Sequence, residues 1–202
     1  SYFVVEFPLI NVGVTSSEAV LIYVFLAVPL FVATGDLLTA GGISQKLVKF
    51  AQSTVPFLPG ATAATTMVSC GLFSAVSGSN AATAATMGRL LGPELEKKGV
   101  DKGLSAALVA AGGTVGVIIP PSVMFLIYGV TVDVSSVDLF VGGIIPGILM
   151  VLVLVSTAVF LTRRKEPTQG LKALKFDQII KNAGNAWLGF IAIGIILFGI
   201  YW

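Results

Sequence analysis

Long apolar stretches alternate with short polar interruptions along this chain. Residues 19–38, 104–132 and 139–162 are each close to, or longer than, the roughly 20 residues that an α-helix needs to cross a bilayer. Residues 61–91 are also apolar but rich in Ala, Thr, Ser and Gly, which lets helices pack closely. Another apolar run begins near Trp187. The pattern predicts an all-α integral membrane protein.

Amphipathic segments and turn residues mark the boundaries between these runs. Residues 43–57 place Leu47 and Val48 against Lys46 and Lys49, which predicts a helix lying in the membrane interface. The whole pattern predicts the end of a preceding segment (1–18), a spanning and an interfacial helix (19–58), a hairpin (59–99), a broken spanning helix (100–136), a spanning helix (137–165), a cytoplasmic amphipathic linker (166–186) and the start of another span (187–202). The chain reads as part of a longer polypeptide.

Two polar breaks interrupt the apolar pattern, at residues 76–83 and 112–122. The first carries Ser77-Gly78-Ser79-Asn80, and the second is rich in Gly and ends at Pro120-Pro121. Backbone that leaves a helix inside a bilayer must face protein, water or a ligand, because lipid offers no hydrogen-bond partner. We therefore expect two unwound segments around a binding site.

The basic residues indicate how the chain crosses the membrane. If residues 61–91 enter and return as a re-entrant hairpin, and the next two units each cross fully, all 12 basic residues lie on one side. The positive-inside rule favours this arrangement and makes that side cytoplasmic. A pair of full spans satisfies the charge count equally well, so the hairpin rests on its short arms, 61–76 and 81–91, and on the polar tip between them. The 12 residues are Lys46, Lys49, Arg89, Lys97, Lys98, Lys102, Arg163, Arg164, Lys165, Lys172, Lys175 and Lys181.

Composition strengthens the membrane prediction and argues against an enzyme. The chain is 55% hydrophobic and 11% charged, with a mean hydropathy of +0.97. It has no His, one Cys and 10 scattered acidic residues, so the usual side-chain sets for metal or nucleophilic catalysis cannot be assembled. We expect Cys70 to be a packing residue, Asp36 to be solvated or to cap a helix, and Arg163 to Lys165 to anchor the orientation.

The chemistry of unwound backbone suggests what the two breaks bind. Exposed carbonyl oxygens suit a hard cation such as Na⁺, while helix N-termini restarting at Ala81 and Ser122 suit an anion. Plainer alternatives exist, since a Ser hydroxyl often bonds back to a helix carbonyl and Gly often serves close helix packing. The Pro pair favours a ligand, because each Pro removes an amide donor and frees carbonyl groups one turn earlier.

At these same positions the chain resembles the large membrane subunit of tripartite ATP-independent periplasmic (TRAP) transporters. The resemblance covers residues 28–165 and rests on the order and spacing of several motifs. These are Pro29-Leu30-Phe31 with Gly35 and Gly41-Gly42-Ile43, then Phe73-Ser74-Ala75-Val76-Ser77-Gly78-Ser79, then Gly116-Val117-Ile118-Ile119-Pro120-Pro121-Ser122, and finally Gly142-Gly143-Ile144-Ile145-Pro146-Gly147.

The resemblance implies the N-terminal half of an elevator-type secondary transporter in the bacterial inner membrane. Such a subunit takes an organic anion, often a carboxylate such as sialic acid or a C4-dicarboxylate, from a periplasmic binding protein (P type) and moves it inward with Na⁺. Its other partners would be a small membrane subunit (Q type), the second half of the large subunit and the lipid bilayer, with no nucleic acid. The implied Na⁺ ligands are Ser74, Ser77, Gly116, Ile119 and Pro121, and the implied substrate-binding residues are Ser79, Asn80, Thr83 and Thr114.

The chain departs from the family pattern after the tip, where Asn80-Ala81-Ala82-Thr83 stands in place of the acidic residue of many relatives. This favours neutral recognition there. Only one repeat is visible, so a second hairpin would lie beyond Trp202. The rivals are a single-component Na⁺/dicarboxylate carrier, a non-transporting membrane scaffold or anchor subunit, and, less favoured because no charged ring or filter motif is present, an ion channel.

Overall fold

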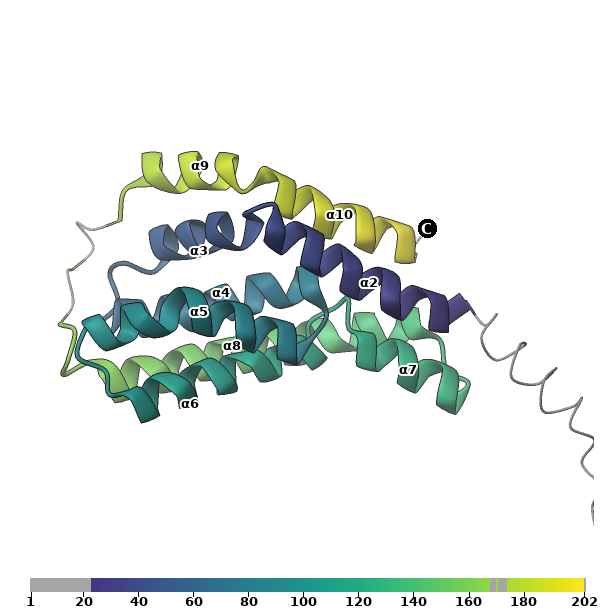
Figure 1. Cartoon of the computed structure of the whole chain (residues 1–202), viewed down its shortest axis with the longest axis horizontal. Coiled ribbons are helices and arrows are strands. Elements are labelled where there is room, and N and C mark those ends of the chain that lie inside the picture. Colours follow the sequence, from purple (N-terminus) through teal and green to yellow (C-terminus); the bar gives the residue numbers. More distant parts are fainter. Residues whose placement is uncertain (1–22, 168–169, 171–173, 202) are drawn as a thin grey trace, which may run out of the picture.

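Helices are the only regular elements in residues 23–167, 170 and 174–201, the part of the chain that the computed structural model describes (Figure 1). The all-α class is confirmed there. The predicted segment 1–18, the first residues of the first span and Lys172 lie outside the described residues. The elements are α2 (Tyr23–Ala40), α3 (Ile43–Thr54), α4 (Ala61–Ser77), α5 (Asn80–Lys97), α6 (Lys102–Gly113), the 3₁₀ helix η1 (Thr114–Val117), α7 (Val123–Val132), α8 (Ser136–Thr162), α9 (Phe176–Asn185) and α10 (Trp187–Tyr201).

The predicted first span and amphipathic helix are helical in the structure, as α2 and α3, joined by a turn at Gly41 and Gly42. Helix α2 continues through Pro29. The expected end of the amphipathic helix at Phe57 was wrong, since α3 ends at Thr54. The residue before a proline avoids helical backbone, and Pro56 therefore stops the helix before Val55.

Helices α4 and α5 form a hairpin, and α6 returns along α5 toward its tip (Figure 1). The predicted end of the second arm at Leu91 was wrong, because α5 continues through Pro93 to Lys97. Its last turns are retained because Leu95 is buried against Ala63 and Met67 of α4. At 17 and 18 residues the two arms are longer than the sequence indicated, so their length is a weaker argument for a re-entrant hairpin.

The helical segments of the broken unit together are about as long as α8. Helix α8 has 27 residues, about 40 Å at 1.5 Å per residue. Helices α6, η1 and α7 together cover about 41 Å. A Cβ on Gly143 would lie 2.7 Å from the Ile118 carbonyl oxygen, and one on Gly147 would lie 2.9 Å from Ile119 Cγ1. The break is therefore opposite the interior of α8, well away from both of its ends.

In the described residues, α8 alone is long and apolar enough to cross a membrane, and the count rises to two if α9 and α10, bent by 61°, form one broken span. Helix α8 continues through Pro146 and exposes large apolar side chains along much of its length, among them Ile145, Val153 and Phe160. Such a surface suits contact with lipid or with other apolar helices.

The base of the hairpin lies at one end of the molecule, where it meets the start of α6 and the end of α8. Glu166, just after α8, accepts hydrogen bonds from the Thr62 amide (3.0 Å) and hydroxyl (3.1 Å) at the start of α4. Its carboxylate is 3.5 Å from Lys98 Nζ, and the Gly60 amide donates to its carbonyl at 2.8 Å. Glu166 therefore fastens the hairpin base to α8, at the end that carries most of the basic residues.

The C-terminal helices lie along the first two helices (Figure 1). Asn182 of α9 donates a hydrogen bond to the Lys49 carbonyl at 3.2 Å. The Phe50 and Phe190 rings meet edge to face at 5.3 Å. The predicted linker 166–186 thus contains a helix, α9, that packs on α3.

Candidate functional site

The hairpin tip is a two-residue break whose geometry depends on Gly78. Helix α4 includes Ser77 and α5 begins at Asn80, so the break is narrower than the sequence suggested. Gly78 closes α4 with a left-handed φ of 58°, and its amide donates to the Ser74 carbonyl at 2.9 Å. Ser79 then caps α5, since its hydroxyl accepts the Ala82 amide at 3.4 Å. One left-handed glycine and one cap are sufficient to reverse the chain.

The second break is likewise narrower than predicted and lies against the tip. Helix α6 extends to Gly113 and residues 114–117 form η1, which leaves residues 118–122 as the non-helical part. The Val123 amide donates to the Gly78 carbonyl at 3.3 Å. A Cβ on Gly78 would lie 2.8 Å from the Pro121 carbonyl oxygen. The expected proximity of the two breaks is therefore present in the structure.

Gly116 brings η1 into direct contact with the start of α5. A Cβ at this position would lie 2.9 Å from both Asn80 Oδ1 and the Ser79 carbonyl carbon, and 3.0 Å from the Asn80 amide nitrogen. Asn80 Oδ1 is buried and has no hydrogen-bond partner among the described residues. Buried polar atoms are nearly always paired, which makes Asn80 Oδ1 a candidate ligand atom; Ser69 Oγ on α4 is likewise buried and unpaired among the described residues.

Three hydroxyl groups form a buried cluster inside the hairpin, which we call the hydroxyl cluster: Ser74, Ser77 and Thr83. Thr83 Oγ1 is 3.0 Å from Ser77 Oγ and 3.4 Å from Ser74 Oγ. Each residue is at most 1% exposed. Ser77 also contacts α2, because a Cβ on Gly35 would lie 3.4 Å from Ser77 Cα. The cluster therefore joins both arms of the hairpin just below its tip.

A cavity of about 270 Å³ opens beside the tip, and we call it the tip cavity. Its walls come from both breaks and from α2. The lining residues are Val32, Gly78, Ser79, Asn80, Ala81, Val117, Val123 and Met124. Helices α5 and α7 both begin at this cavity, so two positive helix ends are directed at one space. Helix α7 begins after Ser122, whose hydroxyl accepts the Phe125 amide at 3.5 Å.

The structure brings some of the expected ligand residues together and separates others. Ser79 and Asn80 line the tip cavity, whereas Thr83 lies in the hydroxyl cluster with Ser74 and Ser77. Thr114 is exposed outside the cavity lining and donates to the Ala111 carbonyl at 2.6 Å.

The expected Na⁺ ligands are also distributed over several contacts. Gly116 packs on Asn80, and the Pro121 carbonyl lies against Gly78. Ile119 packs between Gly71 and Gly147. Within the described ranges no group of three His, Cys, Asp or Glu side chains is placed to hold a metal ion. A cation at this site would therefore depend on neutral carbonyl and hydroxyl oxygens.

Sequence reasoning missed the contribution of α2 to this site. Val32 lines the tip cavity and Gly35 packs on Ser77, although 42 residues separate Gly35 from Ser77. Asp36 lies inside α2 with an exposed side chain, which agrees with the expected solvated role and not with the alternative of a helix cap. The small residue Gly35 is the only signal that the sequence offered for this close approach.

The sequence pattern of the family described as "Tripartite ATP-independent periplasmic transporter, DctM component" matches residues 1–202. The chain belongs to this family. The DctM-component chain is 38% identical over 181 residues to the isethionate TRAP transporter permease protein DctMQ of Oleidesulfovibrio alaskensis, covering 87% of this chain and 28% of the relative. It is 33% identical over 184 residues to the C4-dicarboxylate TRAP transporter large permease protein DctM of Vibrio cholerae, covering 89% of this chain and 39% of the relative.

A third relative is the sialic acid TRAP transporter large permease protein SiaM of Vibrio cholerae, 32% identical over 179 residues, with 89% of this chain and 42% of the relative covered. The DctM-component chain thus spans less than half the length of these relatives. Their names are those of transporter permease subunits, which are membrane proteins and not enzymes.

Proposed function

We propose that this chain is part of a permease subunit that imports a small organic anion together with Na⁺. Its relatives are named for isethionate, C4-dicarboxylates and sialic acid, and we propose a substrate of this class, with a carboxylate as the favoured anionic group. The observation that carries the proposal is the buried, unpaired Asn80 Oδ1 beside Gly116, in a tip region without charged side chains.

Na⁺ would travel as a co-substrate and needs oxygen ligands without competing donors. Asn80 Oδ1 offers one such oxygen and the Pro121 carbonyl another, in a segment where two prolines remove amide donors. Unwound carbonyl groups of this kind coordinate Na⁺ in other transporters. We propose that Asn80 Oδ1 and the carbonyl groups of Gly116, Ile119 and Pro121 form the cation site, together with the hydroxyls of Ser74 and Ser77.

The anion would bind in the tip cavity, where α5 and α7 begin. Helix N-termini attract anions because their first amides lack helical partners and their dipoles are positive. Ser79 and Asn80 line the cavity and would contact the anion directly, Asn80 through its side-chain NH₂ group while its Oδ1 holds Na⁺. Thr83 would act through the hydroxyl cluster, and Thr114 would reach the substrate only after a rearrangement of η1.

The position of the tip supports an elevator mechanism with a re-entrant hairpin. The second break lies opposite Gly143 and Gly147 in the interior of α8, and the tip lies against that break at Pro121, so we infer that a bilayer crossed by α8 contains both in its interior. We propose that α4 to α8, fastened at the base by Glu166, slides as one unit in the bacterial inner membrane. Na⁺ and the anion would each tighten the binding of the other by the same factor, as linkage requires.

The remaining part of the large subunit would supply the second hairpin and complete the site. A Q-type small membrane subunit would brace the moving unit, and a P-type periplasmic protein would deliver the anion. Family membership favours this three-part system over a single-component Na⁺/dicarboxylate carrier and over a membrane scaffold.

The test is uptake by the full-length permease, reconstituted into liposomes with its small subunit and binding protein. Isethionate, succinate and sialic acid are offered in turn, with an inward Na⁺ gradient or with K⁺ in its place. We expect uptake of at least one anion, dependent on both Na⁺ and the binding protein. Uptake that persists equally in K⁺ would refute the coupling, and uptake that needs no binding protein would favour the single-component carrier.

A further inference from the structure

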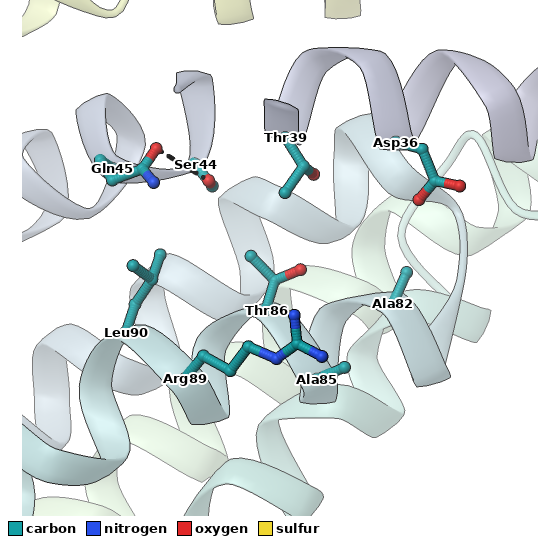
Figure 2. Close-up of a pocket in the computed structure, with 9 residues that line it drawn as sticks. All are labelled: Asp36, Thr39, Ser44, Gln45, Ala82, Ala85, Thr86, Arg89 and Leu90. Carbon is teal, nitrogen blue, oxygen red and sulfur yellow. Dashed lines mark hydrogen bonds between the residues drawn. The ribbon is translucent and has the colours of Figure 1, made fainter. Parts of the chain in front are cut away.

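A second and larger cavity, of about 400 Å³, lies between α2 and α3 on one side and α5 on the other. We call it the Arg89 pocket, and Figure 2 shows its walls. Asp36 and Thr39 come from α2, Ser44 and Gln45 from α3, and Thr86 and Arg89 from α5; Ala82, Ala85 and Leu90 complete the lining. Unlike the tip cavity, it has charged side chains.

The two charges face the pocket from opposite walls. Arg89 lies along α5 with its guanidinium directed toward the end of α5 that begins at the tip, while the Asp36 carboxylate is directed from α2 toward α5 (Figure 2). Neither side chain forms an ion pair within the described ranges. Both side chains are exposed within the described part of the chain, so their charges are free to meet a ligand in the pocket.

The pocket follows the tip cavity along the same pair of helices. On α2, Val32 lines the tip cavity and Asp36, one turn later, lines the Arg89 pocket. On α5, Ala81 lines the tip cavity and the next residue, Ala82, lines the Arg89 pocket. An anion that leaves the tip cavity toward the hairpin base therefore meets the Arg89 pocket next.

The depth of Arg89 sets it apart from the other basic residues of the hairpin base. It lies nine residues after Asn80, about 13 Å along the helix, and eight residues before Lys97, so it is about 12 Å closer to the tip than the basic cluster. A guanidinium at this depth binds carboxylate or sulfonate oxygens in a bidentate manner.

We propose that the Arg89 pocket is a second anion subsite, which holds the substrate between the tip cavity and the cytoplasm. This inference rests on the proposed import function. Arg89 binds the carboxylate or sulfonate group, while Thr86 lines the pocket without a proposed contact to the anion. Asp36 accepts a hydrogen bond from a hydroxyl or ammonium group of the ligand and repels a second negative charge. The subsite therefore selects small monoanions that carry a hydrogen-bond donor.

The test uses Thr86→Cys in the full-length permease with its small subunit, and it does not require transport. The rate at which a membrane-impermeant maleimide labels this cysteine is measured with and without isethionate, succinate or sialic acid, after subtraction of labelling in the protein without the substitution. We expect at least one anion to slow labelling by about fivefold or more. Isethionate should protect better than ethanesulfonate, which has the same charge and lacks the hydroxyl.

When Arg89→Gln is added to Thr86→Cys, the affinity for the protecting anion should fall at least about tenfold, since a charge-assisted hydrogen-bond pair is lost. Arg89→Lys should keep part of the protection. Asp36→Asn should improve protection by succinate relative to isethionate. Arg164→Gln, which removes an exposed arginine beyond the end of α8, is the matched control and should leave protection unchanged.

The outcomes separate this subsite from the import function. Protection that survives Arg89→Gln, or uptake of an anion that never protects Thr86→Cys, would overturn the subsite and leave import standing. Protection lost in Arg89→Gln, in a permease that transports none of the three anions, would support the subsite and overturn the import proposal. If no anion is transported and none protects, both proposals are overturned.

Discussion

Replacing Gly116 with alanine is the most direct perturbation of the proposed site. The new Cβ would lie 2.9 Å from the Ser79 carbonyl carbon and 3.0 Å from the Asn80 amide nitrogen. Unstrained carbon contacts lie at about 3.5–4.0 Å. Both of these neighbours are backbone atoms, so no change of rotamer relieves the overlap. Either η1 or the tip must shift by about half an ångström or more.

Overpacking of this kind costs about 1–3 kcal/mol. Because about 1.4 kcal/mol changes an equilibrium tenfold, the native arrangement of the tip loses about 5- to 150-fold in population relative to displaced ones. We expect Gly116→Ala to raise the Na⁺ concentration for half-maximal uptake at least about fivefold, and larger side chains to abolish uptake. Membrane insertion and the yield of purified permease should be nearly unchanged.

The assay is Na⁺-dependent uptake by the reconstituted full-length permease, alongside its thermal unfolding in detergent. Gly92→Ala on α5 is the matched control: a Cβ there meets nothing within 4 Å, and alanine favours the helix by up to about 1 kcal/mol. It should leave Na⁺ dependence unchanged. If Gly116→Ala transports with the Na⁺ dependence of the parent protein, the contact between η1 and Asn80 is irrelevant to coupling and our reasoning fails.

Three further predictions concern single side chains. Asn80→Ala should lower the apparent affinity for Na⁺ at least about tenfold, both in uptake and in equilibrium binding. Asn185→Ala, at the exposed end of α9, is the control and should leave this affinity unchanged. Equal Na⁺ affinity in both variants would exclude Asn80 as a ligand. Ser77→Phe should abolish uptake while preserving insertion, because the Ser77 side chain is 1% exposed and has no room to grow; normal uptake would contradict this packing. Glu166→Ala should lower the free energy of unfolding by about 1–3 kcal/mol, since the Thr62 amide and hydroxyl lose the carboxylate that accepts their hydrogen bonds. An unchanged melting temperature would show that this contact contributes nothing to stability.

Hydropathy and turn residues predicted the helices well because both signals are local. The boundaries of α4 and α8 lie within a few residues of the expected ones. Local signals failed where tertiary packing prevails, as in α5, which continues through Pro93 because Leu95 is buried against α4. They also overestimated both breaks, since a left-handed Gly78 and a Ser79 cap reverse the chain within two residues.

The sequence predicted which segments meet at the site but not which atoms do. Pairing of Thr83 with Ser77 follows from the hairpin register, and the approach of Gly116 to Asn80 follows from how α6 lies on α5. Neither is encoded by spacing along the chain. The charged Arg89 pocket depends on α2 and α5 facing each other, so Asp36 and Arg89 each looked unremarkable when considered alone.

The contact of Glu166 with the start of α4 has a consequence for the order in which the protein folds during synthesis. The amide and hydroxyl of Thr62 find their acceptor 104 residues later in the chain. At about 5–20 residues per second, a ribosome needs about 5–20 s to synthesise that interval. During this time the hairpin has no cap at the start of α4 and no α8 beside it. At this end of the hairpin, which carries most of the basic residues, water can hydrogen-bond to the Thr62 donors in the meantime, and the contact that fastens the hairpin to α8 forms only after Glu166 has been synthesised.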